Sequence, residues 1–326
     1  MSTNLEQTSG YGEDPHTLRA KELIRREIGM PDSAVFFMAG GTQTNTTVIK
    51  HLLSPCEGVI SVSTGHINVH ESGAIEATGH KVLTIEGHDG LLDAEDLREY
   101  MAAFTADPTN EHMVQPGMVY VSYSSELGTL YTKAGLSAIK SVCEDYELKL
   151  FVDGARIGTG VTSEASDMSM KDIAGLCDAF YIGGTKNGAL LGEAVVFPDT
   201  ARVSVRHFTT LIKQQGGLLA KGRLLGIQFE ALFEDGLFYR NAKHANSKAM
   251  KIKRAFKERG IPFLIDSPTN QQFPILTRKQ HETLSEKFSY ETWQPLKDGR
   301  LAVRFCTSWA TTDENIDALT KEIYRL

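Results

Sequence analysis

Lys186 is the residue whose setting points most directly to chemistry. It stands just beyond two glycines in the segment YIGGTKNG, residues 181–188, and the preceding residues 178–182 predict a strand. A lysine amine attacks a carbonyl only when it is neutral, so a nucleophilic lysine needs a desolvated or cation-lined site that lowers its pKa. The segment therefore indicates either a solvated lysine in a Gly-rich turn or an amine held as a Schiff base to a cofactor.

A Gly-Gly-Thr segment follows another predicted strand. The apolar residues 35–38 lead into AGGTQTN, which opens a helix. Glycines let the backbone approach an anion, and the amides at a helix start can hold a phosphate together with a threonine hydroxyl. Gly40, Gly41 and Thr42 are therefore candidates for a phosphate site, although a Gly-Gly-Thr helix start without a ligand is also common.

Two histidines lie in the segment STGHINVHESGA, which follows the predicted strand 59–62. His66 and His70 are four residues apart and would share one face of a helix, as metal ligands can. The segment matches neither HExxH nor HxxEH and has no evident third ligand. We therefore expect no metal, and interpret His66 as a histidine at a helix start or one that stacks on an aromatic ligand.

Three charged residues also follow or lie on predicted strands. Asp153 begins the segment DGAR directly after an apolar strand, where a carboxylate is costly unless a cation meets it. Either Arg156 is that cation, or Asp153 faces a protonated ring nitrogen and Arg156 faces a substrate anion. Arg304 lies in LAVRFCTSW, where it either caps a domain interface or binds a carboxylate with its planar guanidinium.

These groups together match the needs of one cofactor. In chain order they supply a phosphate cradle, a stacking histidine, an aspartate for a ring nitrogen, a lysine for an aldehyde and an arginine for a carboxylate. Those are the parts of a pyridoxal 5'-phosphate site. In that setting Gly183 and Gly184 would leave clearance for a flat cofactor, and Thr185 would be a further phosphate donor.

The elements that must position these residues alternate between strand and helix. This alternation predicts an α/β fold with a mainly parallel sheet flanked by helices, in which ligands gather at the carboxyl ends of the strands. The predicted strands are residues 35–38, 59–62, 81–85, 118–122, 149–152, 178–182 and 194–197, and the predicted helices are residues 44–53, 93–104, 136–146 and 170–176.

Two domains are expected. Residues 1–240 would form a large cofactor-binding domain, which includes interdomain helices from about residue 216. The helical region 216–260 is interrupted near residues 234–236. Residues 241–326 would form a small α+β domain, with strands at residues 273–276 and 301–306 and helices at residues 279–288 and 313–324.

Composition excludes several other classes of protein. The 326 residues are 41% hydrophobic and 23% charged, which is typical of a soluble globular protein with a large core. The net charge of −7, without a basic cluster, argues against nucleic acid or an anionic membrane as a partner. Four scattered cysteines indicate reduced thiols, and the lack of a signal pattern or of about 18 consecutive apolar residues predicts a cytoplasmic protein.

The chain resembles the fold-type I pyridoxal-phosphate enzymes. Within them it is similar to the low-specificity L-threonine aldolase and phenylserine aldolase branch of the aromatic amino acid beta-eliminating lyase group. The resemblance runs from about Tyr11 to the C-terminus and depends on the joint order of its motifs, which are YGEDP, GGTQTN, GHINVHESGA, GLLDAEDL, GTLY, DGAR, GGTKNG and VRFCTSWATT. It implies a seven-stranded sheet in the large domain and a small C-terminal α+β domain.

The resemblance also implies roles for individual residues. Lys186 would form the Schiff base with the cofactor, His66 would stack on the pyridine ring and Asp153 would hold the ring nitrogen. The phosphate would be held by Gly40, Gly41 and Thr42. Arg304 would bind the substrate carboxylate, and Arg156 would lie close to the ring hydroxyl or the same carboxylate.

The implied assembly is a homodimer or homotetramer with shared active sites. Tyr11 and a basic residue within residues 206–221 would complete the site of a neighbouring subunit. Only ten residues precede YGED, whereas relatives usually begin with a further helix and a Ser-Asp segment that reaches the active site. A protein that binds the cofactor but has impaired catalysis is therefore one alternative.

The implied reaction is retro-aldol cleavage of L-threonine, L-allo-threonine or a related L-3-hydroxy-2-amino acid, such as phenylserine, to glycine and an aldehyde. Beta-elimination on another amino acid is a second alternative. Relatives usually have serine where this chain has Gly40, and many have a histidine where this chain reads SYSSELGT. The base would then be His66, a phosphate-held water or, ranked last as a glutamate in a surface loop, Glu126.

Overall fold

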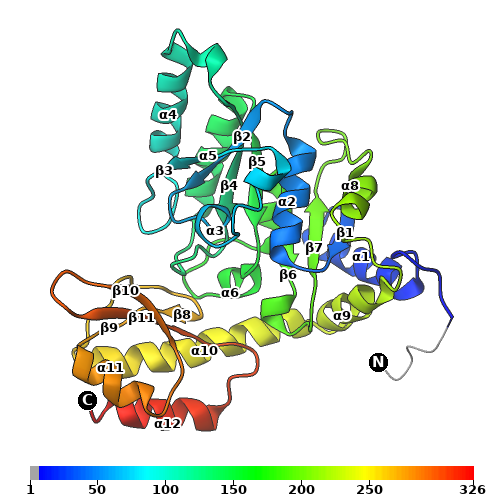
Figure 1. The fold of residues 1–326 in the computed structure, drawn as a ribbon. Coiled ribbons are helices and arrows are strands. Elements are labelled where there is room, and N and C mark those ends of the chain that lie inside the picture. The colour runs from blue at the N-terminus through cyan, green and yellow to red at the C-terminus, as the bar shows by residue number, and fades with distance from the viewer. Residues whose placement is uncertain (1–6) are drawn as a thin grey trace.

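The computed structural model describes residues 7–326, and its larger part is built on one seven-stranded sheet (Figure 1). The strands, in their order across the sheet, are β1 (Ala34–Met38), β7 (Glu193–Phe197), β6 (Ala179–Gly183), β5 (Lys149–Asp153), β4 (Gln115–Ser122), β2 (Glu57–Val62) and β3 (Val82–Ile85). Only β7 runs against the other six, because it pairs antiparallel with both of its neighbours. The predicted mainly parallel seven-stranded sheet is confirmed.

The reversed direction of β7 affects what lies at the functional edge of the sheet. The six parallel strands end at one edge, and β7 begins there. In the strand register Glu193, the first residue of β7, stands opposite both Met38 at the end of β1 and Gly183 at the end of β6. The edge therefore collects the residues that follow six strands and those that begin the seventh.

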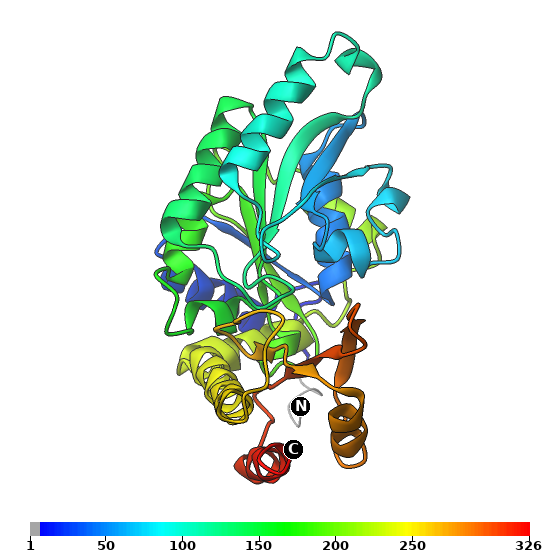
Figure 2. The same cartoon turned by 90° about the vertical axis from the view of Figure 1, so that its left-hand side faces the viewer.

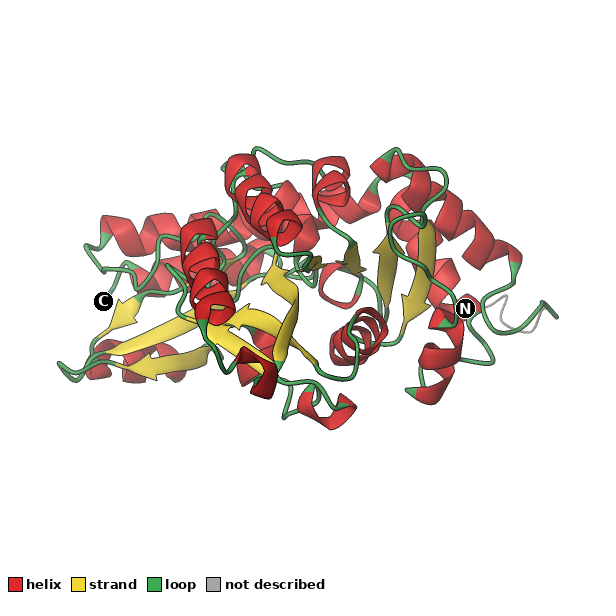
Figure 3. Cartoon of the chain, turned by 90° about the horizontal axis from the view of Figure 1, so that it is seen from above, coloured by secondary structure: helices red, strands yellow, loops and turns green. Residues whose placement is uncertain are grey.

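Helices cover both faces of this sheet, as Figure 3 shows from above. Side chains alternate along each strand, so that Val119 and Val121 join the core on one face while Met118 and Tyr120 join the core on the other. The first face is covered by α1 (Pro15–Ile28), α4 (Ala94–Ala106), α5 (Lys133–Asp145), α7 (Met170–Leu176) and α9 (Arg223–Glu234). The second is covered by α2 (Gly41–Leu52), α3 (His66–Val69) and α8 (Phe208–Gln214).

One long helix was absent from the sequence prediction. Helix α1 begins after Asp14, which lies in the motif YGEDP, and the carboxylate of Asp14 accepts a hydrogen bond from the amide of Thr17 at 2.9 Å. The helix packs on α9, where Gly226 has no room for a side chain because an added Cβ would lie 2.4 Å from the Thr17 hydroxyl. Asp14 before Pro15 is a helix-start signal that could have predicted it.

The C-terminal part forms a smaller unit below the large sheet in Figures 1 and 2. Its sheet pairs β10 (Glu291–Pro295), β11 (Leu301–Cys306) and β8 (Gln271–Gln272), and β9 (Ile275–Leu276) also pairs with β11. The long helix α10 (Leu237–Glu258) and the helices α11 (Arg278–Ser285) and α12 (Asp313–Ile323) pack on it. The remaining short helices are α6 (Ile157–Val161), η1 (Glu76–Thr78), η2 (Asn110–His112) and η3 (Thr185–Asn187).

Several details of the C-terminal half differ from the prediction. Residues 216–222 are not helical, since α8 ends at Gln214 and α9 begins at Arg223. Within the predicted strand 273–276 only β9 (Ile275–Leu276) is a strand, and the short strand β8 (Gln271–Gln272) lies just before that range. Strand β10 was not predicted. The predicted interruption near residues 234–236 is confirmed, with Gly236 in the left-handed region at φ 67°. A domain boundary at residue 240 stays a prediction, because α10 passes through it without a break.

No helix among residues 7–326 is both long enough and apolar enough to cross a membrane.

Candidate active site

A cavity of about 340 Å³ lies at the edge of the large sheet where the parallel strands end. Segments that follow β1, β2, β4, β5 and β6 line it, together with the start of β7. The cavity brings together eight of the nine residues predicted for the site, which are Gly40, Gly41, Thr42, His66, Asp153, Arg156, Thr185 and Lys186. Arg304 is not among the residues that line it.

Lys186 lies in the short helix η3, directly after β6. Its side chain is exposed and lines the cavity. Desolvation lowers the pKa of the Lys186 amine, and the nearby positive charge of Arg156 lowers it further. Such an amine is the kind that can act as a nucleophile, so the solvated-turn interpretation of this lysine is not favoured.

The glycines before Lys186 have a packing role that was not predicted. A Cβ added to Gly183 would lie 2.3 Å from the carbonyl oxygen of Ala155, and one added to Gly184 would lie 2.6 Å from that of Gly192. Both glycines therefore let neighbouring backbone segments pack against the end of β6. The expectation that they also clear space for a flat cofactor stays a prediction.

Thr185 is also engaged with the chain itself. Its hydroxyl accepts a hydrogen bond from the amide of Gly192 at 3.1 Å. The residue lines the cavity, so a role as a phosphate donor stays a prediction.

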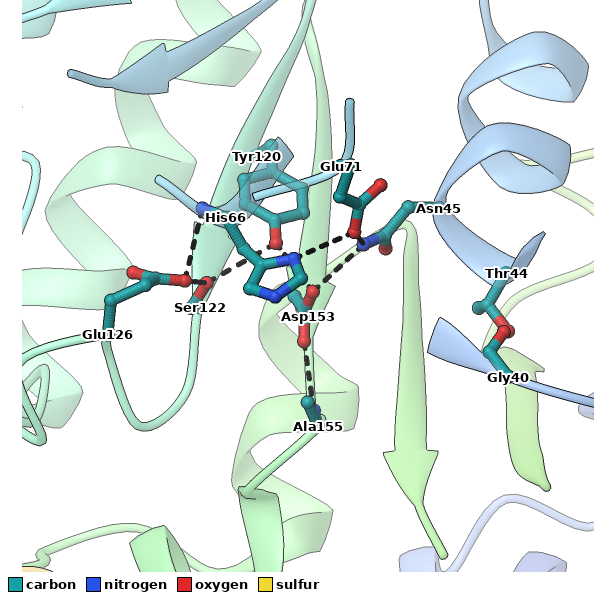
Figure 4. Close-up of polar contacts among 10 residues, drawn as sticks. All are labelled: Gly40, Thr44, Asn45, His66, Glu71, Tyr120, Ser122, Glu126, Asp153 and Ala155. Carbon is teal, nitrogen blue, oxygen red and sulfur yellow. Dashed lines mark hydrogen bonds and ion pairs between the residues drawn. The ribbon is translucent and has the colours of Figure 1, made fainter. Parts of the chain in front are cut away.

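Asp153 is the last residue of β5, and its side chain is held by neutral donors (Figure 4). Its Oδ2 accepts hydrogen bonds from the Tyr120 hydroxyl at 2.5 Å and from Asn45 Nδ2 at 3.1 Å, while Oδ1 accepts one from the amide of Ala155 at 2.9 Å. Asp153 and Arg156, both within the described chain, form no ion pair. The guanidinium of Arg156 has no hydrogen-bond or ion-pair partner among residues 7–326, so it is available to an anion in the cavity.

His66 begins α3 and belongs to a hydrogen-bonded chain that reaches Asp153. Its Nδ1 lies 2.8 Å from Glu71 Oε1, and Asn45 Nδ2 bonds both that oxygen, at 2.8 Å, and Asp153 Oδ2. The contact with Glu71 raises the pKa of His66. In Figure 4 the imidazole lies between Glu126 on one side and Glu71 with Asn45 on the other. His70 is near, with ring centroids 5.6 Å apart.

Metal coordination was the other interpretation of these histidines. Within residues 7–326 there is no group of three or more histidine, cysteine, aspartate or glutamate side chains arranged to hold a metal ion.

Two buried glutamates at the cavity were missed or misjudged from the sequence. Glu126 was expected in a surface loop, which is wrong: it is only 8% exposed and faces the cavity. Glu193 accepts a hydrogen bond from the amide of Gly184 at 3.0 Å, and burial raises its pKa to about 7. A sequence signal existed for Glu193, since a charged residue that opens the apolar run EAVVF needs a polar partner.

Asn45 and Glu71 were quoted within motifs but were not singled out. Their sequence signals were weak, because each is one polar residue in a helix or loop segment. Their link to Asp153 joins residues 108 positions apart and depends on the packing of α2 against the sheet.

Arg304 lies on β11, in the smaller unit. Its guanidinium is paired with Glu291, donates a hydrogen bond to Gln271 at 3.2 Å and lies 5.2 Å from the ring centroid of Trp293. The structure therefore places Arg304 next to β10 rather than in the lining of the cavity. Its predicted contact with a substrate carboxylate stays a prediction.

Tyr11 lies outside the cavity as well. Its side chain is 52% exposed, and Lys213 Nζ lies 4.9 Å from its ring centroid. Both belong to the segments that were predicted to complete the site of a neighbouring subunit.

The residues present fit pyridoxal 5'-phosphate. Helix α2 begins at Gly41 without a side-chain cap, and a Cβ at Gly40 would meet no atom within 4 Å, so the helix start is open to an anion. The unpaired Arg156 supplies a second anion contact. A lysine with a lowered pKa and a buried aspartate complete the set that the aldehyde and the ring nitrogen require.

The fold and this set of donors define a fold-type I pyridoxal-phosphate-dependent enzyme. The model of the family described as beta-eliminating lyase matches residues 1–278, and the chain belongs to that family.

Curated relatives and solved structures agree with this assignment. The low specificity L-threonine aldolase of Pseudomonas sp. (strain NCIMB 10558) is 30% identical over 319 residues, which cover 96% of this chain and 88% of the relative. That of Pseudomonas aeruginosa is 29% identical with the same coverage. The structure of a Leishmania major threonine aldolase is 43% identical, with a TM-score of 0.94 over 99% of this chain and 93% of that one.

A more distant structure shows how far the fold extends. An aspartate aminotransferase of Thermus thermophilus superposes with a TM-score of 0.71 over 98% of this chain and 88% of that chain, at 17% identity. This likeness shows a common fold and nothing about the reaction.

Proposed function

We propose that this protein is a carbon–carbon lyase that cleaves L-3-hydroxy-2-amino acids, L-threonine and L-allo-threonine among them, to glycine and an aldehyde. The observation that carries the proposal is the cavity in which Lys186, Asp153 and an unpaired Arg156 converge at the edge of the sheet. The names of the relatives at about 30% and 43% identity support the choice of substrate class.

The residues would hold the cofactor as follows. Lys186 Nζ would bind its aldehyde carbon covalently, and Asp153 would hydrogen-bond the ring nitrogen and keep it protonated. The amides at the start of α2 and the Thr42 hydroxyl would bind the phosphate, with Gly40 and Gly41 leaving the backbone close to it. When bound, pyridoxal 5'-phosphate accepts the electron pair that is released when the bond between the α and β carbons breaks.

The chain's own residues would perform the remaining tasks. The imidazole of His66 would lie against the cofactor ring, oriented by Glu71. Arg156 would bind an anionic group, either the ring hydroxyl or the substrate carboxylate. Arg304 would bind the carboxylate after its guanidinium leaves Glu291. One further group must remove the proton of the 3-hydroxyl.

We propose in addition a cytoplasmic homodimer or homotetramer. The support is the resemblance to the family and the exposed position of Tyr11 beside Lys213, which leaves this pair available to a second copy. Light scattering of the purified protein tests the oligomeric state, and a monomer at micromolar concentration would contradict it.

Product analysis tests the proposed reaction. The purified holoenzyme, incubated with L-threonine and separately with L-phenylserine, should release glycine and the matching aldehyde. Pyruvate and ammonia would instead indicate beta-elimination and overturn the proposal.

The covalent attachment site is tested separately. Borohydride reduction followed by peptide mapping should place the pyridoxyl group on Lys186, and the variant Lys186→Ala should carry none. Lys279→Ala is the control, because Lys279 is exposed on α11 and away from the cavity. Labelling of any other lysine would refute the assignment.

A further inference from the structure

The cavity holds more acidic side chains than a binding site for an anionic cofactor requires. Four carboxyl groups line it, those of Glu71, Glu126, Asp153 and Glu193. All four residues are at most 8% exposed. Buried carboxylates that share a site repel one another, and burial together with the charge of Asp153 raises the pKa of both Glu126 and Glu193.

Three of these acids have structural tasks that the contacts identify. Asp153 accepts hydrogen bonds from three neutral donors, and Glu71 bonds both His66 and Asn45. Glu193 accepts a hydrogen bond from the amide of Gly184 and thereby holds the turn that carries Lys186. Each of these carboxyls orients another part of the site.

Glu126 is held through one of its oxygens only, as Glu71 is, but the unpartnered Oε2 of Glu71 is fully buried, whereas that of Glu126 is not. Oε1 accepts hydrogen bonds from the Ser122 hydroxyl at 2.7 Å and from the backbone amide of His66 at 3.2 Å. Oε2 forms no hydrogen bond with any residue of the described chain, and in Figure 4 it lies on the side away from both donors. The side chain is thus held in one orientation with one oxygen left for a ligand.

The electrostatic setting of Glu126 allows it to carry a proton. Burial raises its pKa, and the charge of Asp153 at the end of β5 raises it further, while the Ser122 hydroxyl and the charge of His66 lower it. Tyr120 and Tyr131, the other titratable groups near it, have raised pKa values and stay neutral phenols.

His66 is the competing candidate for the base, and its contacts argue against that role. The hydrogen bond between its Nδ1 and Glu71 raises the pKa of the imidazole, so the ring is stabilised in its protonated form. This shift makes the neutral imidazole, the form that can accept a proton, less available. Its place against the cofactor ring needs no proton transfer.

We propose that Glu126 is the catalytic base that accepts the proton of the substrate's 3-hydroxyl, with Ser122 as its positioning residue. This inference rests on the proposed cleavage of 3-hydroxy-2-amino acids. The O–H electron pair becomes the second bond of the aldehyde carbonyl, the bond between the α and β carbons breaks, and its electron pair goes to the α carbon. The α carbon gains a proton as glycine forms, so no oxidant or reductant is needed.

The variant Glu126→Gln tests this role, because it keeps an oxygen for Ser122 and the His66 amide but cannot take a proton. In the holoenzyme we expect kcat for L-threonine cleavage to fall by about 10²- to 10⁴-fold, the usual contribution of a general base. The same variant should still exchange the α-proton of glycine with deuterium in D₂O, followed by proton NMR, because glycine has no hydroxyl. Glu164→Gln, an exposed control, should leave both rates unchanged.

Each other outcome overturns the proposal. If Glu126→Gln cleaves L-threonine at the wild-type rate, another group is the base. Loss of both cleavage and glycine exchange would mean that Glu126 only supports the site. If the wild-type enzyme exchanges the α-proton of glycine but cleaves no 3-hydroxy amino acid, the proposed function itself is wrong. The role proposed for Glu126 is then wrong as well.

Ser122→Ala provides a second, independent test that does not require the glutamine variant to fold. The Ser122 hydroxyl lowers the pKa of Glu126, so its removal should raise that pKa. The acid limb of the pH dependence of kcat should then move to higher pH in Ser122→Ala. A limb that does not move would exclude Glu126 as the group that titrates.

Discussion

At the scale of single residues, Asp153 shows how a buried carboxylate is held without a cation. Tyr120, Asn45 and the amide of Ala155 fix its orientation through hydrogen bonds of 2.5–3.1 Å. A carboxylate that is already solvated by the protein can hold a ring nitrogen protonated without reorganising. Its contribution to the reaction should therefore be electrostatic and should exceed its contribution to binding.

Replacing Asp153 should damage turnover more than binding. We expect Asp153→Ala to lower kcat by about 100-fold or more, as loss of a preorganised electrostatic partner does. Tyr120→Phe removes one hydrogen bond worth about 1 kcal/mol and should lower kcat by about tenfold at most. Steady-state kinetics with L-threonine checks both, and normal turnover by Asp153→Ala would show that the ring nitrogen has another partner.

Glu193 should make the stability of the cofactor-free protein depend on pH. Burial raises its pKa from 4.5 to about 7, so the folded state prefers the protonated carboxyl. The stability that this preference provides is complete below about pH 4.5 and is lost as the pH rises through about 7, a change of about 3 kcal/mol.

Urea unfolding at several pH values checks this effect. The free energy of unfolding of Glu193→Gln should vary less than that of wild type between pH 5 and 8, because the amide does not titrate. Equal pH dependence of the two proteins would show that Glu193 is not the titrating group.

At the scale of elements, the junction of β5 and β6 leaves no room for a side chain. Gly154 follows Asp153 directly, and an added Cβ would lie 1.8 Å from the carbonyl oxygen of Tyr181. The carbonyl of Gly154 also accepts a hydrogen bond from the amide of Gly183 at 2.9 Å. This contact sets the distance between the strand end that carries Asp153 and the turn that carries Lys186.

Gly154→Ala should therefore destabilise the fold, by about 1–3 kcal/mol if the strands shift only slightly. Gly175→Ala is the matched control, because Gly175 lies in α7 with no atom within 4 Å of an added Cβ. Alanine there should stabilise the helix by about 0.5–1 kcal/mol. Chemical unfolding of both variants checks the pair, and equal effects would contradict the role given to this junction.

At the scale of the whole molecule, the predicted role of Arg304 would require the larger and smaller parts of the chain to act together. The cavity belongs to the large sheet, whereas Arg304 lies on β11 and is occupied by Glu291 on β10. Any contact between Arg304 and a substrate carboxylate therefore competes with an ion pair inside the smaller unit.

Glu291→Gln should lower KM for L-threonine, because it frees Arg304 for the substrate. The effect should be at most about fivefold, since a partly exposed pair contributes about 1 kcal/mol or less. Arg304→Lys should raise KM, because lysine lacks the planar guanidinium. An unchanged KM in both variants would remove Arg304 from the substrate site.

The sequence by itself determined the alternation of strands and helices, the mainly parallel sheet and which residues follow the strands and so meet at one edge of the sheet. These follow from local periodicity and from the rule that ligands gather at the strand ends. Eight of the nine predicted site residues line one cavity for that reason. Sequence reasoning also predicted α7 and β11 with their observed bounds, since each has a clear pattern and a clear end.

Only the tertiary structure decided the rest. The reversal of β7 brings Glu193 to the cavity, the loop after β4 buries Glu126 there, and β10 holds Arg304 outside it. Each outcome depends on contacts between residues far apart in the sequence or on the path of a loop. Hydrophobic periodicity reports which face of an element is buried, but not which polar groups the neighbouring elements place against it.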